Sequence, residues 1–177
     1  RARAPAPASM DATSPQRAVA GYSPGGDRPL GPYVLLTAIF ATGFAGGLEG
    51  ARRSRGSLPE RYGVLDLVMV GAAAHKISRL ITKDKVTAFI RAPFTRYQES
   101  SGQGEVEEEP RGDGMRYAIG ELLVCPYCVG QWVAGALVVG MVGAPRLTRT
   151  IAFMYTAETA ADFLQLAYLA AEERAEP

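Results

Sequence analysis

The sequence predicts an all-α protein, an integral membrane helical bundle of three to four apolar helices with a disordered N-terminal tail. Residues 30–48 and 122–145 contain no charged residue, and residues 150–171 form a further apolar stretch. Residues 1–29 are rich in Pro and Gly and lack apolar periodicity, which is typical of disorder. A formal net charge of +1 gives no basic surface, so no nucleic-acid partner is expected.

The first apolar run predicts a transmembrane helix over residues 30–50. A helix over 30–48 is about 28 Å long, which matches the hydrocarbon thickness of a bilayer. The arginines that follow at once, in ARRSRG, indicate that this end is cytoplasmic. Glycines at 43, 46, 47 and 50 form two overlapping GxxxG spacings. Such spacings favour close helix contact, although glycine is common in membrane helices in any case.

Residues 63–82 begin an expected membrane domain that extends to residue 171 and precedes a polar tail, 172–177. Their first half is largely apolar, but His75, Lys76 and Arg79 interrupt the second half. A charge at mid-bilayer costs about 2.5–3.5 kcal/mol. The helix therefore either packs inside a bundle or ends at the cytoplasmic interface. The second alternative keeps the basic residues of 52–96 on one side and satisfies the positive-inside rule better.

The middle of the chain predicts two surface segments. Residues 83–97 are cationic and aromatic, which suits a segment along the membrane surface or an ordinary connecting loop. Residues 98–114 (QESSGQGEVEEEPRGDG) predict a flexible acidic linker with a solvated run of glutamates.

Two carboxylates interrupt the last apolar stretch. Glu158 and Asp162 are four residues apart and share one helical face. At least one should face protein rather than lipid, and Lys76 and Arg79 are the expected partners. Alternatively the last helix lies at a surface with both carboxylates in water.

Two motifs are similar to those of the bacterial membrane proteins catalogued as domain-of-unknown-function family 1360. One has the form R-L-I-T-x-D followed by R-A-P-F, and the other the form G-E-L-L-x-C-P-Y-C-x-G-x-W. The resemblance covers about residues 64–170 and implies a location in a bacterial cell membrane as a multi-pass protein, without an assigned chemistry. The residues that carry it, together with the paired carboxylates, are the candidate interaction and structural residues: Arg79, Asp84, Arg91, Glu121, Trp132, Glu158 and Asp162.

The second motif contains the only two cysteines of the chain, Cys125 and Cys128. Residues three apart share a helix face, and Pro126 fits a first helical turn. Cys125 would then be an N-cap, where the helix end favours a thiolate.

Three roles remain open for the cysteine pair. The two cysteines pack a helix contact as thiols at the cytoplasmic edge, or form a redox-active dithiol, or, with His75, supply part of a metal site.

The expected function is a structural or protein-interaction role in a bacterial membrane, as a subunit of a membrane assembly. The alternative is a membrane thiol-disulfide oxidoreductase that uses the C-P-Y-C pair. An enzyme is the less favoured class, since the nucleophile-elbow, phosphate-loop and dinucleotide motifs do not occur in the sequence. No cofactor is expected. The expected partners are the lipid bilayer and either another membrane protein or a second copy of the chain.

Overall fold

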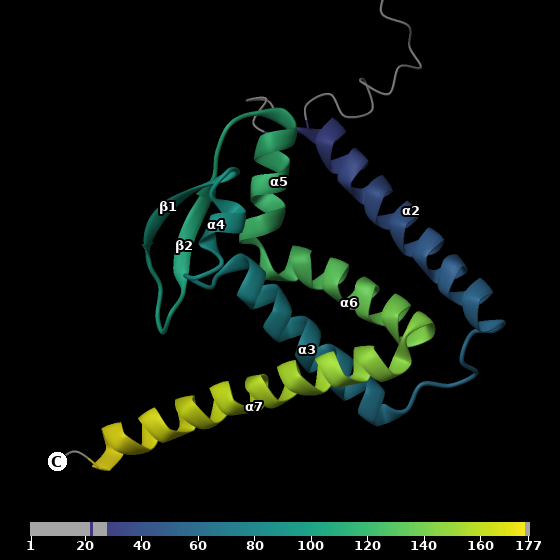
Figure 1. Cartoon of the computed structure of the whole chain (residues 1–177). Coiled ribbons are helices and arrows are strands. Elements are labelled where there is room, and N and C mark those ends of the chain that lie inside the picture. Colours follow the sequence, from purple (N-terminus) through teal and green to yellow (C-terminus); the bar gives the residue numbers. More distant parts are fainter. Residues whose placement is uncertain (1–21, 23–27, 176–177) are drawn as a thin grey trace, which may run out of the picture.

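The computed structural model describes residue 22 and residues 28–175, so the expected disordered tail lies almost entirely outside the described residues. The described chain is mostly helical, with one small sheet in addition to the expected helices (Figure 1). The elements are α2 (Leu30–Arg55), α3 (Val64–Thr82), α4 (Ala88–Arg91), β1 (Thr95–Ser100), β2 (Val106–Pro110), α5 (Gly114–Val124), α6 (Pro126–Gly143) and α7 (Pro145–Ala175).

Helices α2 and α6 are the two that are long and apolar enough to cross a membrane in the described part of the chain. Helix α2 ends where Gly56 adopts a left-handed conformation (φ 84°) and donates its N–H to the carbonyl of Arg52 at 2.8 Å. A residue with a Cβ is strained in that conformation, so glycine ends the helix. Helix α6 begins at Pro126, which has no N–H to leave unsatisfied in the first turn.

Helices α2 and α6 run in the same direction. Their contacts advance together, from the first third of each helix to its end. The Phe40 and Trp132 ring centroids are 5.3 Å apart, a Cβ on Gly47 would lie 3.3 Å from Val139, and a Cβ on Gly143 would lie 3.4 Å from Ala51. Of the predicted GxxxG glycines, Gly47 thus permits close approach to α6, as small residues do between membrane helices.

Helix α3 returns along α6 in the opposite direction. Ser78 lies against Gly130 near one end of α6, and Asp66 shares a cleft with Met141 and Val142 at the other end. Helix α7 then runs parallel to α3, with contacts in regular order. Arg149 pairs with Asp66 (2.9 Å), Thr156 Oγ1 donates to the carbonyl of Met69 (3.0 Å), and Asp162 pairs with Lys76 (2.7 Å).

The buried core between α3, α6 and α7 is small. It consists of Ala73, Ala74, Leu137 and Ala152. Many large apolar side chains are instead exposed, among them Val34 at 68% and Val64 at 80%. Exposed apolar surface of this extent indicates a face that meets lipid or another protein rather than water.

The expected acidic linker is wrong, because much of it folds as a hairpin. Strands β1 and β2 pair antiparallel, with Thr95 opposite Pro110 and Tyr97 opposite Glu108. The glutamates of 105–109 are not a solvated run, since each pairs with a cation: Glu105 with Arg79, Glu107 with Lys83, Glu108 with Arg91, and Glu109 with Arg96. Opposite charges placed across the hairpin and α3 order this segment.

The expected surface segment 83–97 is likewise divided, between a turn, the short α4 and the start of β1. Phe89 is exposed, but Arg91 is fully buried and cannot lie along a membrane surface.

The favoured placement of 52–96 on one side is also wrong. Arg55 donates to the carbonyl of Gly143 (3.0 Å) at the end of α6, whereas the hairpin adjoins the other end of α3 (Figure 1).

Candidate functional site

The cysteine pair lies at the junction of α5 and α6. Cys125 is extended (φ −105°, ψ 104°), ends α5 and caps the N-terminus of α6. Its Sγ accepts the backbone N–H of Cys128 at 3.2 Å. The predicted N-cap at Cys125 and the predicted first-turn Pro126 are therefore confirmed. The two sulfurs lie at disulfide-bonding distance, with Cα atoms 5.2 Å apart, whereas the packing alternative expected free thiols.

The surroundings of the pair favour chemistry at one sulfur over the other. Tyr127 is 92% exposed and Cys128 is exposed, while Cys125 is half-buried. The positive end of the α6 dipole and the N–H of Cys128 both stabilise negative charge on Cys125 Sγ. The arrangement therefore lets an incoming thiolate reach Cys128 and lets Cys125 depart as a thiolate.

The other residues of the second motif hold α2 against α5 and α6. Glu121 pairs with Arg28 at 2.5 Å and accepts a hydrogen bond from the Tyr33 hydroxyl. Trp132 packs on Phe40. Arg28 and Tyr33 were not identified from the sequence. Their only signal is that they are polar side chains at the start of an apolar helix, next to the predicted tail.

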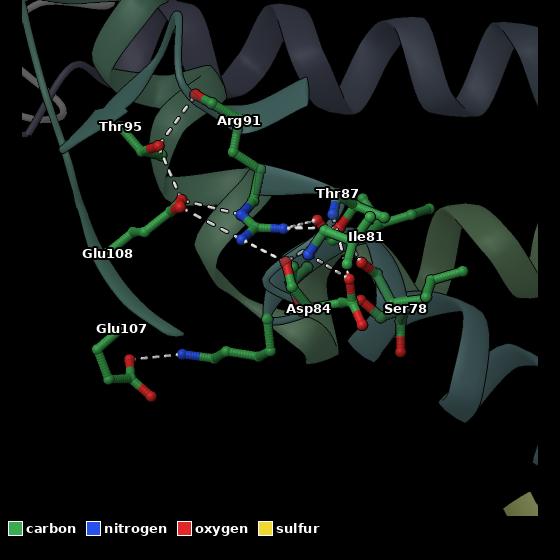
Figure 2. Close-up of polar contacts among 12 residues, drawn as sticks. Ser78, Ile81, Asp84, Thr87, Arg91, Thr95, Glu107 and Glu108 are labelled. Carbon is green, nitrogen blue, oxygen red and sulfur yellow. Dashed lines mark hydrogen bonds and ion pairs between the residues drawn. The ribbon is translucent and has the colours of Figure 1, made fainter. Parts of the chain in front are cut away.

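The first motif centres on Arg91, whose guanidinium is fully buried beneath the hairpin (Figure 2). It makes a two-pronged ion pair with Glu108, through Nε at 2.9 Å and an Nη at 3.2 Å. Thr95 Oγ1 donates to the same carboxylate at 2.8 Å. The remaining guanidinium donors reach the carbonyl of Ile81 (2.8 Å), the carbonyl of Asp84 (3.0 Å) and Thr87 Oγ1 (3.0 Å).

The neighbouring charged groups of this motif are also used inside the fold. Asp84 Oδ1 accepts the backbone N–H groups of Val86 (2.7 Å) and Thr87 (3.1 Å), which starts the turn into α4. Arg79 makes a two-pronged pair with Glu105, at 3.0 and 2.5 Å. The first motif therefore builds the hairpin onto the end of α3.

The glutamate partners of this motif were missed from the sequence because three of them form one uniform charge run. Lys83 donates to Glu107 at 2.6 Å, and this hydrogen bond holds the pKa of Glu107 below its ordinary value of 4.5.

Lys76 joins α3 to α7. It pairs with Asp162 at 2.7 Å and with Glu158 at 3.4 Å, and its side chain is 18% exposed. Of the two expected partners of these carboxylates, Lys76 reaches both, whereas Arg79 pairs with Glu105 instead.

His75 lies on the exposed side of α3, beside a cleft of about 1100 Å³ between α3, the hairpin tip and the second half of α7. In the described residues, no group of three or more His, Cys, Asp or Glu side chains could hold a metal ion. The structure therefore does not bring His75 and the cysteines together as metal ligands.

Comparison with known proteins adds relatives that share these motifs. The sporulation protein YjcA of Bacillus subtilis (strain 168) is 35% identical over 77 residues, which are 42% of this chain and 65% of that protein. The chain thus spans just under two thirds of the length of YjcA. The UPF0713 protein YngL of the same organism is 30% identical over 108 residues, 61% of this chain and 82% of that protein. No solved structure matches.

The sequence profile of the family described as "Protein of unknown function (DUF1360)" matches residues 69–168. This range contains most of α3, the hairpin, α5, α6 and most of α7. It includes both motifs and the Lys76 contact to α7. The chain belongs to the DUF1360 family.

Proposed function

We propose that the chain is a multi-pass protein of a bacterial cell membrane, in which α2, α3, α6 and α7 all cross the bilayer. The parallel packing of α2 and α6 carries this proposal. Two spans that run in the same direction require the chain to return across the membrane between them. Helix α3, with 19 residues and a length of about 28 Å, is the described helix between them that is long enough.

The ion pairs between α3 and α7 support the crossing of these two less apolar helices. Lys76 lies near the middle of the α3–α7 contact and is neutralised by Glu158 and Asp162. A charge in a bilayer is tolerated where it pairs inside a bundle. The second ion pair, Asp66 with Arg149, lies near the starts of both helices, where water and headgroups are close.

The role proposed for this membrane protein is structural or interactive, as a subunit of an assembly. The charged residues of the first motif hold the hairpin and α5 rigidly at one end of α3. The second half of α7 extends past this body (Figure 1), with large exposed apolar side chains available to a partner. They include Phe163 (64%), Leu164 (71%) and Leu166 (58%). The two relatives from Bacillus subtilis support a bacterial setting.

A thiol-disulfide oxidoreductase is the second candidate function. The observation that favours it is the exposed Cys128 beside an N-capping Cys125 at disulfide-bonding distance. A purely packing role does not require either sulfur to be accessible.

Two epitope tags test the crossing of α3. One is inserted after Gly102 at the hairpin tip, and the other after Ser57 in the connection between α2 and α3. Antibody staining of intact and permeabilised cells should place the two tags on opposite sides of the membrane. Staining of both tags on the same side would contradict the crossing.

The interaction role is tested by the size of the complex extracted from native membranes in mild detergent. The full chain should migrate above the mass of a detergent-bound monomer, and Phe163→Arg should reduce that mass. Cys125→Ala/Cys128→Ala is the matched control, and it should leave the mass unchanged if the cysteines serve a separate function. A wild-type monomer would contradict the interaction role.

A further inference from the structure

The first described helix indicates which side of the membrane each end occupies. Within about 15 residues of α2, the sequence has four arginines after the helix and two before it. The four are Arg52, Arg53, Arg55 and Arg61. Excess Lys and Arg marks the cytoplasmic end, and the first helix usually dominates orientation. The C-terminal end of α2 is then cytoplasmic.

The cysteine pair lies at the other end of the bundle. Because α6 runs parallel to α2, the N-terminus of α6 shares a side with the N-terminus of α2. The contact of Glu121, one turn before Cys125, with Arg28 and Tyr33 at the start of α2 places both on that side. The expected position of the cysteines at the cytoplasmic edge is therefore reversed in this arrangement.

The pairing of the two sulfurs is an independent observation that agrees with this side. Disulfides persist outside the cytosol and are rare inside it, where reducing systems keep thiols free. The sulfurs lie at bonding distance, and Cys128 is exposed. Orientation and pairing thus point to the same compartment.

We infer that Cys125 and Cys128 form a disulfide on the extracytoplasmic face of the membrane, where it accepts electrons from dithiols of exported proteins. This inference rests on the proposed crossing topology and on the second candidate function. It names the side of the membrane, the sulfur that is attacked and the class of substrate.

The reaction follows from the exposure of the two sulfurs. A substrate thiolate attacks Cys128 Sγ and forms a mixed disulfide, and the Sγ–Sγ bond breaks with its electron pair leaving on Cys125. The N–H of Cys128 and the start of α6 stabilise that thiolate. The second thiolate of the substrate then attacks the substrate sulfur of the mixed disulfide and releases Cys128. The substrate dithiol is oxidised to a disulfide, the cysteine pair is reduced, and two protons are distributed among the thiols and water.

Labelling of intact cells tests the side. Cells that express the full chain are treated with a membrane-impermeant phosphine reductant and then with a membrane-impermeant maleimide. Cys125 and Cys128 should become labelled only after reduction. The control is Ser57→Cys in a Cys125→Ala/Cys128→Ala background, which should be labelled only by a permeant maleimide.

The labelling outcomes separate the two proposals. Labelling of Ser57→Cys together with protection of the native cysteines would overturn the inference and leave the crossing topology intact. Protection of both positions would also overturn the inference. Labelling of both positions by the impermeant reagent would instead contradict the crossing itself.

The exchange reaction is tested on the purified full chain in detergent with a reduced synthetic peptide that contains two cysteines. The oxidised chain should convert one equivalent of peptide to its disulfide, and Cys125→Ala/Cys128→Ala should convert none. Equal conversion by both proteins, or by neither, would overturn the proposed exchange. Over a pH series, alkylation of Cys125 in Cys128→Ala should persist to lower pH than alkylation of Cys128 in Cys125→Ala. The reverse order would overturn the assignment of Cys125 as the departing sulfur.

Discussion

Replacement of Arg91 by Met should release the hairpin from the end of α3. The Arg91 guanidinium is fully buried, and the carboxylate side chain of its partner Glu108 is 5% exposed. Removing one partner of a buried ion pair leaves an uncompensated charge and costs about 3–5 kcal/mol. The carbonyls of Ile81 and Asp84 also lose their donors, so the upper part of that range is expected.

Amide hydrogen exchange of residues 95–110 in detergent measures this effect directly. A loss of about 3–5 kcal/mol corresponds to exchange that is faster by roughly two to three and a half orders of magnitude. Arg96→Ala is the matched control. Its ion pair with Glu109 crosses the same hairpin at 3.2 Å, but the two side chains are 69% and 49% exposed. An exposed pair of this kind contributes about 0–1 kcal/mol.

The comparison between the two arginines decides whether burial sets the cost. Arg91→Lys should recover only part of the stability, because an ammonium cannot make the two-pronged contact with Glu108. Equal exchange rates in Arg91→Met and Arg96→Ala would refute the argument that the buried guanidinium holds the hairpin in place.

Three further perturbations act on other contacts. Gly120→Ala should lower stability by about 1–3 kcal/mol in a thermal unfolding assay, because the new Cβ would lie 2.6 Å from the carbonyl oxygen of Phe94. Lys76→Met should lower stability in the same assay by about 2–3 kcal/mol, because it leaves Glu158 and Asp162 without their cation. The pKa of Glu107 is lowered in the folded state by the Lys83 hydrogen bond, so its contribution is present above the ordinary pKa of 4.5 and is lost as pH falls below that value. Exchange in the hairpin should therefore accelerate in that acid range.

Each of these expectations has a control that isolates its cause. Gly130→Ala places a Cβ at an ordinary 3.8 Å from Ser78 and should be neutral or stabilising, since alanine favours a helix by up to about 1 kcal/mol. Lys76→Met/Glu158→Gln/Asp162→Asn should regain much of the loss in Lys76→Met, and failure to do so would show that charge is not the cause. Glu107→Gln should lose one component of the acid dependence, so an unchanged pH profile would contradict its assignment to Glu107.

The helices and the helix start at Cys125 could be predicted from the sequence because each has a local cause. Uncharged length gives α2 and α6, and Pro126 after a residue able to cap gives the start of α6. The pairing of Lys76 with Glu158 and Asp162 was also within reach, since few groups can neutralise a carboxylate inside an apolar helix.

The hairpin and the direction of packing could not be predicted in the same way. The glutamates of β2 resemble a solvated charge run unless their partners on α3, α4 and β1 are known, and these partners are distant in sequence. The parallel arrangement of α2 and α6 depends on which faces meet, through contacts such as that of Phe40 with Trp132. Hydropathy carries no information about that choice.

The contact between Lys76 and Asp162 has a consequence for biosynthesis. The two residues are 86 positions apart, so a ribosome that adds about 5–20 residues per second completes the partner roughly 4–17 seconds after the lysine. During that interval a four-crossing chain holds α3 at the membrane with an uncompensated ammonium. Helix α3 then has to wait beside the insertion machinery, or lie at the headgroups, until α7 emerges. The two helices would enter the bilayer as a pair, and truncation of the nascent chain before Asp162 should leave α3 extractable by alkaline carbonate.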